Sequence, residues 1–268
     1  MTEREKILSD EYYDMITDYE LPPQISMDIG EDFVYQPIEG ELGITYINRN
    51  NVPPLGISNY AYSMIPKLYG FQQRSGSKRA GTFDPTPLIE SGITTVQRGP
   101  LNLTGKGVVI GFVDTGIRYE EEVFRNPDGS TRILGIWDQT IQEGTPPEGF
   151  YYGTEYTREM INRALQSENP REVVPSYDES GHGTALASVA AGSVVGSGLT
   201  FVGAAPEAEI VMVKLKEAKP HLKEFYLVPE EVEAYAESDI LAAVKYLESY
   251  AIAVSRALVI CFGAGTNM

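Results

Sequence analysis

Two short stretches, 182 − 114 = 68 residues apart, constrain the fold of this chain most strongly. The first runs from Gly107 to Ile117 and holds the near-continuous apolar run typical of a strand covered on both faces, ending at Asp114. The second runs from Ser180 to Gly192 and predicts a small-residue helix with His182 in its first turn. Ligand sites of parallel sheets gather where strands end, so Asp114 and His182 form a candidate carboxylate-oriented general base.

From Leu101 onward, strand and helix patterns alternate, which predicts an α/β fold with a parallel sheet and helices on its faces. We expect a helix over residues 157–166 and an amphipathic helix over 238–250, with Ser238 as its N-cap. The apolar stripe of the second helix is expected to face the core and consists of Ile240, Leu241, Val244 and Leu247. Four apolar runs predict the strands Val108–Val113, Arg132–Trp137, Ile210–Leu215 and Ala257–Phe262.

Residues 1–97 differ in texture from residues 98–268, because Pro, Asn, Gln and Tyr interrupt every periodic run. We therefore expect a small separate α+β domain over 1–97, followed by the larger domain over 98–268. Within the small domain, the patterns predict an acidic helix over Ile7–Tyr19, a strand over Leu42–Ile47, a strand or mixed element over Tyr60–Ile65, and an exposed basic loop over Gln73–Gly81.

Composition excludes several classes of function. The net charge of −17 argues against nucleic acid as a partner, because phosphate backbones are bound by clusters of Lys and Arg. A single cysteine, Cys261, and two histidines 39 residues apart predict no metal site and no cofactor. We find no signal peptide pattern and no apolar run of about eighteen residues, so we expect a protein outside the membrane.

Two other interpretations of the motifs are weaker. Asp114-Thr-Gly also occurs in aspartic peptidases, but these need two carboxylates at one site, and such a reading leaves His182 without a role. The glycines of Gly105–Gly111 resemble a nucleotide-binding loop, yet they precede the strand instead of linking it to a helix. A tight turn that enters a buried strand is the simpler interpretation.

Together the motifs resemble those of the subtilisin-like serine peptidases, whose triad runs Asp, His, Ser along the chain. Val113–Ile117 is similar to the Asp motif of that family, and Gly181–Thr184 is similar to its His motif. Gly203–Pro206 and Val259–Gly263 resemble two further family segments in the expected order. The resemblance implies a three-layer subtilisin-like domain, catalytic roles for Asp114 and His182, and a substrate-binding role for Gly263.

Several segments resemble the clostridial branch of that family, the Csp peptidases, which act in spore germination; they include Leu103–Gly107, Ile136–Gln139, Tyr152–Tyr156 and Val213–Lys216. This resemblance implies that residues 1–97 are a propeptide able to associate with the peptidase domain. It also implies a protein or peptide substrate, and a cytoplasmic or spore-associated location.

The nucleophile motif of the family, Gly-Thr-Ser before Ala-Pro, and the oxyanion Asn do not occur in the 268 residues, so we expect the chain as given to be an incomplete, inactive peptidase domain of low stability. Ser180, Ser188, Ser193 and Asn267 are poorly placed as substitutes, and Cys261 in an apolar strand is expected to be an inert core residue. Loss of the serine lowers turnover about 10⁶-fold in subtilisin itself.

Three hypotheses for function follow. The first is part of a serine endopeptidase. The second is a catalytically silent pseudopeptidase that binds a partner, for example in germination. The third is a distinct hydrolase that uses Asp114 and His182 with another nucleophile.

Overall fold

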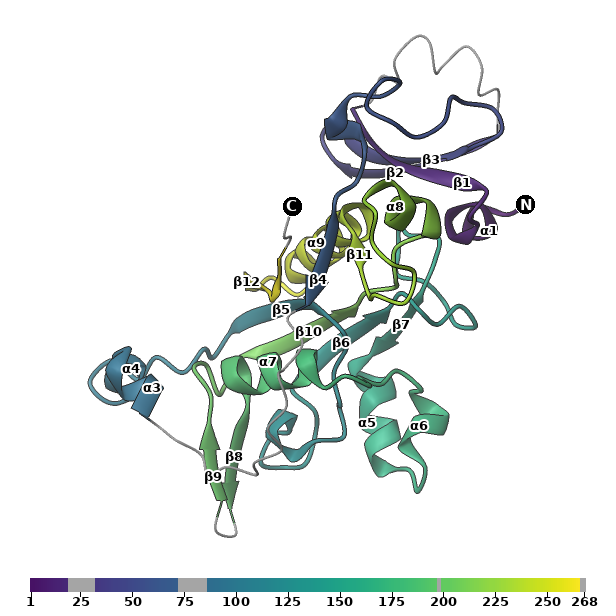
Figure 1. The fold of residues 1–268 in the computed structure, drawn as a ribbon. Helices are drawn as coiled ribbons and strands as arrows, with labels where there is room; N and C mark the ends of the chain where they lie inside the picture. Colours follow the sequence, from purple (N-terminus) through teal and green to yellow (C-terminus); the bar gives the residue numbers. More distant parts are fainter. Residues whose placement is uncertain (19–31, 72–85, 197–198, 266–268) are drawn as a thin grey trace.

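The computed structural model describes residues 1–18, 32–71, 86–196 and 199–265. Its centre is a five-stranded sheet in the order β12-β5-β10-β6-β7 (Figure 1). Four strands are parallel, and β7 (Thr154–Thr157) runs antiparallel at the edge beside β6. The parallel strands are β12 (Ala257–Phe262), β5 (Val108–Asp114), β10 (Glu209–Lys214) and β6 (Ile133–Asp138). The predicted α/β fold is confirmed, and each predicted strand lies within one residue of its observed position.

Helices cover both faces of this sheet. In Figure 1, α9 (Glu237–Ala253) lies over one face, and α7 (His182–Ala191) lies over the other. Side chains of β5 alternate between the two resulting cores: Val109 and Val113 belong to the α9 side, whereas Ile110 and Phe112 belong to the α7 side. Burial on both faces explains the continuous apolar run in this part of the sequence. The α7 side also holds η2 (Glu122–Phe124), α5 (Arg158–Gln166) and the short α6 (Pro170–Val173).

The long helix α9 corrects one expectation. Its N-cap is Ala236, so Ser238 lies inside the first turn and is buried. The fully buried face combines small residues with Asp239, Tyr246 and Leu247. Three residues of the expected stripe are only half-buried: Ile240, Leu241 and Val244. Close packing on the sheet favours the small residues: a Cβ added to Gly111 would lie 2.8 Å from the side chain of Leu247.

The N-terminal region forms a second sheet in the order β1-β3-β2, with all pairs antiparallel. Its strands are β1 (Tyr12–Thr17), β2 (Phe33–Glu39) and β3 (Leu42–Asn48). The predicted strand over Leu42–Ile47 is confirmed, but the helix predicted over Ile7–Tyr19 is wrong. Helix α1 (Glu3–Leu8), opened by a Thr2–Glu5 capping box, ends before β1, whose aromatic and β-branched residues are buried against β3.

Other N-terminal expectations have mixed outcomes. Residues 60–65 contain the short 3-10 helix η1 (Tyr62–Met64) and no strand. The predicted basic loop over Gln73–Gly81 lies outside the described residues. Helices α3 (Thr86–Glu90) and α4 (Ile93–Gln97) project from one side of the molecule, and β8 (Ser193–Gly196) and β9 (Leu199–Val202) form a projecting hairpin (Figure 1).

Buried charges join the N-terminal sheet to the larger domain. The ammonium of Lys219, next to α8 (Pro220–Phe225), lies 2.6 Å from Asp14 of β1, and both side chains are buried. Lys216 pairs with Asp239 of α9 at 2.7 Å, and Ser238 donates a hydrogen bond to Asp14. Breaking a pair of this kind leaves a buried charge without a partner, so the contact resists separation.

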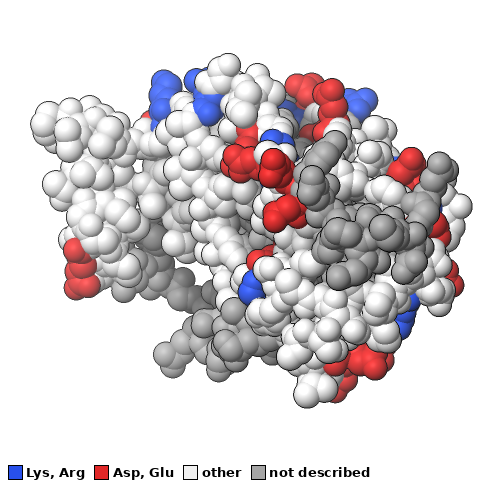
Figure 2. Space-filling view, turned by 90° about the horizontal axis from the view of Figure 1, so that it is seen from above, with Lys and Arg blue, Asp and Glu red and all other residues white. Residues whose placement is uncertain are grey.

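At the surface, acidic side chains predominate, as the net charge of −17 requires. Figure 2 shows groups of them on several parts of one face, with basic side chains between. Within the described ranges, no helix is long and apolar enough to cross a membrane.

Candidate active site

The structure brings Asp114 and His182 into direct contact at the carboxyl edge of the central sheet. Asp114 is the last residue of β5 and is fully buried, and His182 is the first residue of α7. Nδ1 of the imidazole lies 2.8 Å from Oδ1 and 3.0 Å from Oδ2 of Asp114. The His182 side chain keeps 19% of its surface exposed, and no described residue hydrogen-bonds to its Nε2. One ring nitrogen is therefore fixed by a carboxylate, while the other is available to a reactant.

Two glycines around His182 make this contact possible. Gly181 is the N-cap of α7 and has φ of +75°, a conformation that glycine adopts without strain. A Cβ on Gly183 would lie 2.3 Å from the carbonyl oxygen of Gly116 and 2.9 Å from Oδ1 of Asp114. The first turn of α7 can thus approach the end of β5 only because position 183 has no side chain.

A second carboxylate, Asp178, organises the start of α7, and sequence reasoning missed it. It is fully buried and accepts hydrogen bonds from the hydroxyl of Thr115, the amide of Gly181, and both the amide and hydroxyl of Thr184. Burial works against the charged form, but these donors keep the pKa of Asp178 below its ordinary value. The only available signal was an acid close to the predicted helix start.

Thr115 connects the two carboxylates. Its amide donates to Oδ1 of Asp114 at 2.7 Å, and its hydroxyl accepts from the amide of Gly183 at 3.1 Å. Burial raises the pKa of Asp114, and hydrogen bonds from His182 and Thr115 oppose that rise. A buried carboxylate that accepts from Nδ1 holds a neutral imidazole in the tautomer whose Nε2 can take up a proton.

Beside the imidazole, an extended segment lies between two other strands, and we call the space that it fills the groove. Gly263, expected to bind substrate, directly precedes one of these two strands. A Cβ on Gly263 would lie 3.2 Å from Cε1 of His182, so Gly263 lies directly beside the imidazole. Strand β4 (Leu68–Phe71) pairs antiparallel with β11 (Tyr235–Ala236) on one side and with β13 (Ala264–Gly265) on the other. In Figure 1, β4 descends from the N-terminal sheet toward the end of β5.

The end of β4 reaches His182 itself. The ring of Phe71 lies 5.1 Å from the imidazole and 4.7 Å from the ring of Tyr235, measured between ring centres. The groove beside the Asp–His pair therefore holds β4 as a middle strand and has an aromatic contact next to the imidazole. Backbone pairing of this type recognises extended peptides with little dependence on their sequence.

None of the nucleophile substitutes considered above acquires that role from the geometry. The hydroxyl of Ser180 donates to Thr115, and that of Ser188 donates to the carbonyl of Thr184. Ser193 opens β8, and Asn267 lies outside the described residues. Cys261 is half-buried in β12, where burial first and the charge of Asp114 second raise the pKa of its thiol. A raised pKa disfavours the nucleophilic thiolate.

Metal chemistry has no visible site in the part of the chain that the structure describes. No three His, Cys, Asp or Glu side chains gather there in a way that would hold a metal ion.

Comparison with known proteins agrees with this geometry. The family model described as the subtilase family matches residues 105–235. The chain is 32% identical to the serine protease AprX of Bacillus subtilis over 120 residues, which are 45% of this chain and 19% of AprX. It is 33% identical to the subtilisin-like protease SBT3.3 of Arabidopsis thaliana over 135 residues, covering 42% of this chain and 17% of that protein.

A solved structure extends the similarity. The CspB protease of Clostridium perfringens matches with a TM-score of 0.54 and 30% identity, over 67% of this chain and 33% of that chain. The chain spans a third or less of the length of each of these relatives. The family match contains Asp114, Asp178 and His182, and the strand–helix geometry that joins them is the one described above. Residues 105–235, which contain the Asp–His pair, are thus similar to the subtilase family.

Proposed function

We propose that Asp114 and His182 are the acid and the general base of a subtilisin-like serine endopeptidase site. In this mechanism Nε2 of His182 takes the proton of a serine hydroxyl as that oxygen attacks a peptide carbonyl, and later returns it to the leaving amine. Asp114 orients the imidazole and stabilises its charged form. The 2.8 Å contact between Asp114 and Nδ1, with Nε2 left available, is the observation that carries the proposal. The mechanism also needs a serine nucleophile, and neither Ser180 nor Ser188 is placed for that role.

The substrate in this proposal is a protein or peptide in extended form. Strand β4 supports it, because a polypeptide already lies between β11 and β13 and reaches His182 through Phe71. By the same argument, residues 1–97 act as a propeptide, whose strand β4 occupies the groove. A cytoplasmic or spore-associated setting is part of the proposal, and immunolocalisation of the native protein tests it.

A second function, that of a catalytically silent binding protein, is favoured by one observation. The occupied groove joins the N-terminal sheet to the larger domain through backbone pairing, and buried ion pairs reinforce that contact. A protein held in this state would present a stable surface to a partner instead of turning over substrate.

Labelling with a fluorophosphonate probe, which reacts with activated serines, separates the two functions. The longest natural product of the gene is expected to be labelled after its N-terminal region has been removed, and the 268-residue chain is expected to remain unlabelled. Labelling that disappears in Asp114→Asn supports the peptidase. A full-length product that never reacts, although circular dichroism shows it to be folded, contradicts the peptidase and supports the binding protein.

A further inference from the structure

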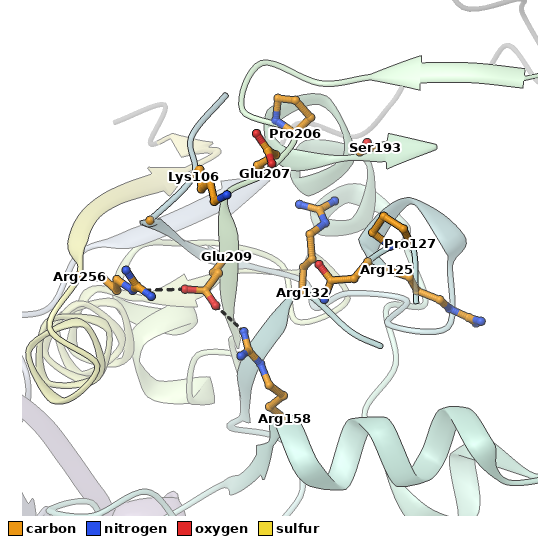
Figure 3. Close-up of a pocket in the computed structure, with 12 residues that line it drawn as sticks. Lys106, Arg125, Pro127, Arg132, Arg158, Ser193, Pro206, Glu207, Glu209 and Arg256 are labelled. Atoms are coloured by element: carbon orange, nitrogen blue, oxygen red, sulfur yellow. Dashed lines mark hydrogen bonds and ion pairs between the residues drawn. The ribbon is translucent and has the colours of Figure 1, made fainter. Parts of the chain in front are cut away.

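A second polar pocket lies at the amino edge of the central sheet, opposite the edge that carries Asp114 and His182. Its volume is about 420 Å³. Half of its lining comes from residues just before the strands, including Lys106 before β5, Arg132 before β6, Glu207 before β10 and Arg256 before β12 (Figure 3). Parallel strands begin at the same edge, so residues distant in the sequence meet there.

The charge of this pocket is the reverse of that of the whole chain. The sequence has 38 acidic and 21 basic residues. The lining instead holds two acidic side chains, Glu207 and Glu209, and five basic ones, Lys106, Arg125, Arg132, Arg158 and Arg256. A concentration of positive charge in a strongly acidic protein favours anions at one place.

The two carboxylates do not neutralise these cations. Glu209 is shared, with one oxygen 2.6 Å from Arg158 and the other 3.6 Å from Arg256. Glu207 accepts a hydrogen bond from the hydroxyl of Thr104. Among the described residues, neither Lys106 nor Arg132 has an acidic side chain within ion-pair distance.

Arg132 is held as a fixed donor. Its side chain is only 6% exposed, and its two terminal nitrogens donate to the carbonyls of Ala208 and Val123 at 2.9 and 2.6 Å. Its Nε is buried and has no partner in the described structure. Burial lowers the pKa of Arg132, because the guanidinium is removed from water, and the charge of Glu207 only partly opposes that shift.

Two more arginines of the lining have the same deficit. The Nε atoms of Arg125 and Arg158 are also buried without a partner among the described residues. Figure 3 shows Lys106, Arg132, Arg158 and Arg256 directed toward the centre of the pocket, whereas the guanidinium of Arg125 is turned away. Four cations thus line one cavity, and two of them, Lys106 and Arg132, have no carboxylate within ion-pair distance among the described residues.

We propose that this pocket binds a small ligand bearing more than one oxyanion group, phosphate or carboxylate. Guanidinium groups match both kinds of group with paired N–H donors. A volume of about 420 Å³ is larger than a single inorganic ion needs. The cations of the lining together carry more positive charge than one monovalent anion would balance. The site depends on no catalytic residue and is independent of the proposed peptidase activity.

Isothermal titration calorimetry on the 268-residue chain tests this proposal, with pyrophosphate and citrate as probes at constant ionic strength. Pyrophosphate binding tighter than citrate binding identifies a phosphate site, and the reverse identifies a carboxylate site. The double variant Lys106→Gln, Arg256→Gln is expected to weaken binding at least about 10-fold, the cost of losing charge-assisted contacts. Glu207→Gln is expected to tighten it, since a carboxylate leaves the pocket.

Arg98→Gln is the matched control, because Arg98 is exposed and does not line the pocket. Its affinity is expected to equal that of the unaltered chain. Equal affinity in the double variant, or weakening of similar size in Arg98→Gln, would show a diffuse ionic effect and overturn the proposal. Absence of heat with both probes, on protein shown to be folded by circular dichroism, would also overturn it.

Discussion

The chain has two histidines, and the structure gives them opposite surroundings. His182 has a carboxylate on Nδ1 and keeps part of its ring exposed in the groove. His221, in α8, is buried; neither of its ring nitrogens has a partner among the described residues, and its ring packs edge-on against Tyr13 at 5.0 Å. Burial lowers the pKa of His221 to about 4. The same type of side chain is thus positioned as a base at His182 and packed as a neutral core residue at His221.

The difference shows that access and a partner decide what an imidazole does. A general base needs one nitrogen oriented and the other free, which the end of a strand and the start of a helix provide together at His182. The ring of His221 extends from α8 toward Tyr13 of the N-terminal sheet. A charge there would have no water and no hydrogen-bond acceptor in contact with it. His221 therefore contributes packing that attaches the N-terminal sheet to α8.

The largest expected effect separates the two histidines by activity. In the longest natural product, His182→Ala is expected to lower turnover about 10⁶-fold, the loss found when the triad histidine of subtilisin is removed. His221→Phe, which preserves ring packing on Tyr13, is expected to change turnover by less than about threefold, because it removes no charge from the groove. Burst kinetics with a peptide ester would measure both. A large loss of turnover in His221→Phe would show that His221 is needed for more than packing.

The next effect is the pH dependence of stability. The unfolded chain protonates His221 near its ordinary pKa of 6.5, whereas the folded chain does so at about 4. The unfolded state therefore binds more protons between these values, so the stability contribution is complete above pH 6.5 and declines as the pH falls toward 4. The loss is expected to reach about 3.5 kcal/mol below pH 4, because the pKa falls from 6.5 to about 4 and each unit corresponds to about 1.4 kcal/mol.

Urea unfolding of the 268-residue chain at pH 7 and pH 4.5 measures this loss. The neighbouring buried carboxylates also titrate, so His221→Phe is the control that isolates the imidazole. Its stability is expected to fall less over the same interval. Equal declines in both proteins would assign the pH dependence to groups other than His221.

The sequence predicted the first of these histidines and not the second. His182 stands in a glycine-flanked motif at a helix start, and the strand that ends at Asp114 is apolar throughout, so both positions follow from local pattern. His221 follows Pro220 at the start of a short helix, and nothing in its neighbours indicates burial. Its environment is created by β1, which lies more than 200 residues earlier and was predicted as a helix.

The same physical reason explains the other omissions. Asp178 acts through donors from residues 115, 181 and 184, and a contact between two loops leaves no periodicity in the sequence. The amino-edge pocket joins residues that each look like an ordinary charge before a strand. A strand can be predicted from its own residues, because its pattern is local. A site at the ends of several strands depends on the order of those strands in the sheet, which no local pattern gives.

The smallest of the three effects tests how His182 is placed. Gly183→Ala would put a methyl group against the carbonyl of Gly116 and Oδ1 of Asp114, so the first turn of α7 must move outward. We expect a loss of about 1–3 kcal/mol in stability, the range for overpacking a tight contact. Gly70→Ala in β4 is the control, because its added Cβ meets no atom within 4 Å and should leave the unfolding midpoint nearly unchanged. The NMR signal of the proton on Nδ1 of His182, shifted downfield by its bond to Asp114, is expected to weaken in Gly183→Ala and persist in Gly70→Ala. If the signal persists in both proteins, close approach at position 183 is not what holds the imidazole on its carboxylate.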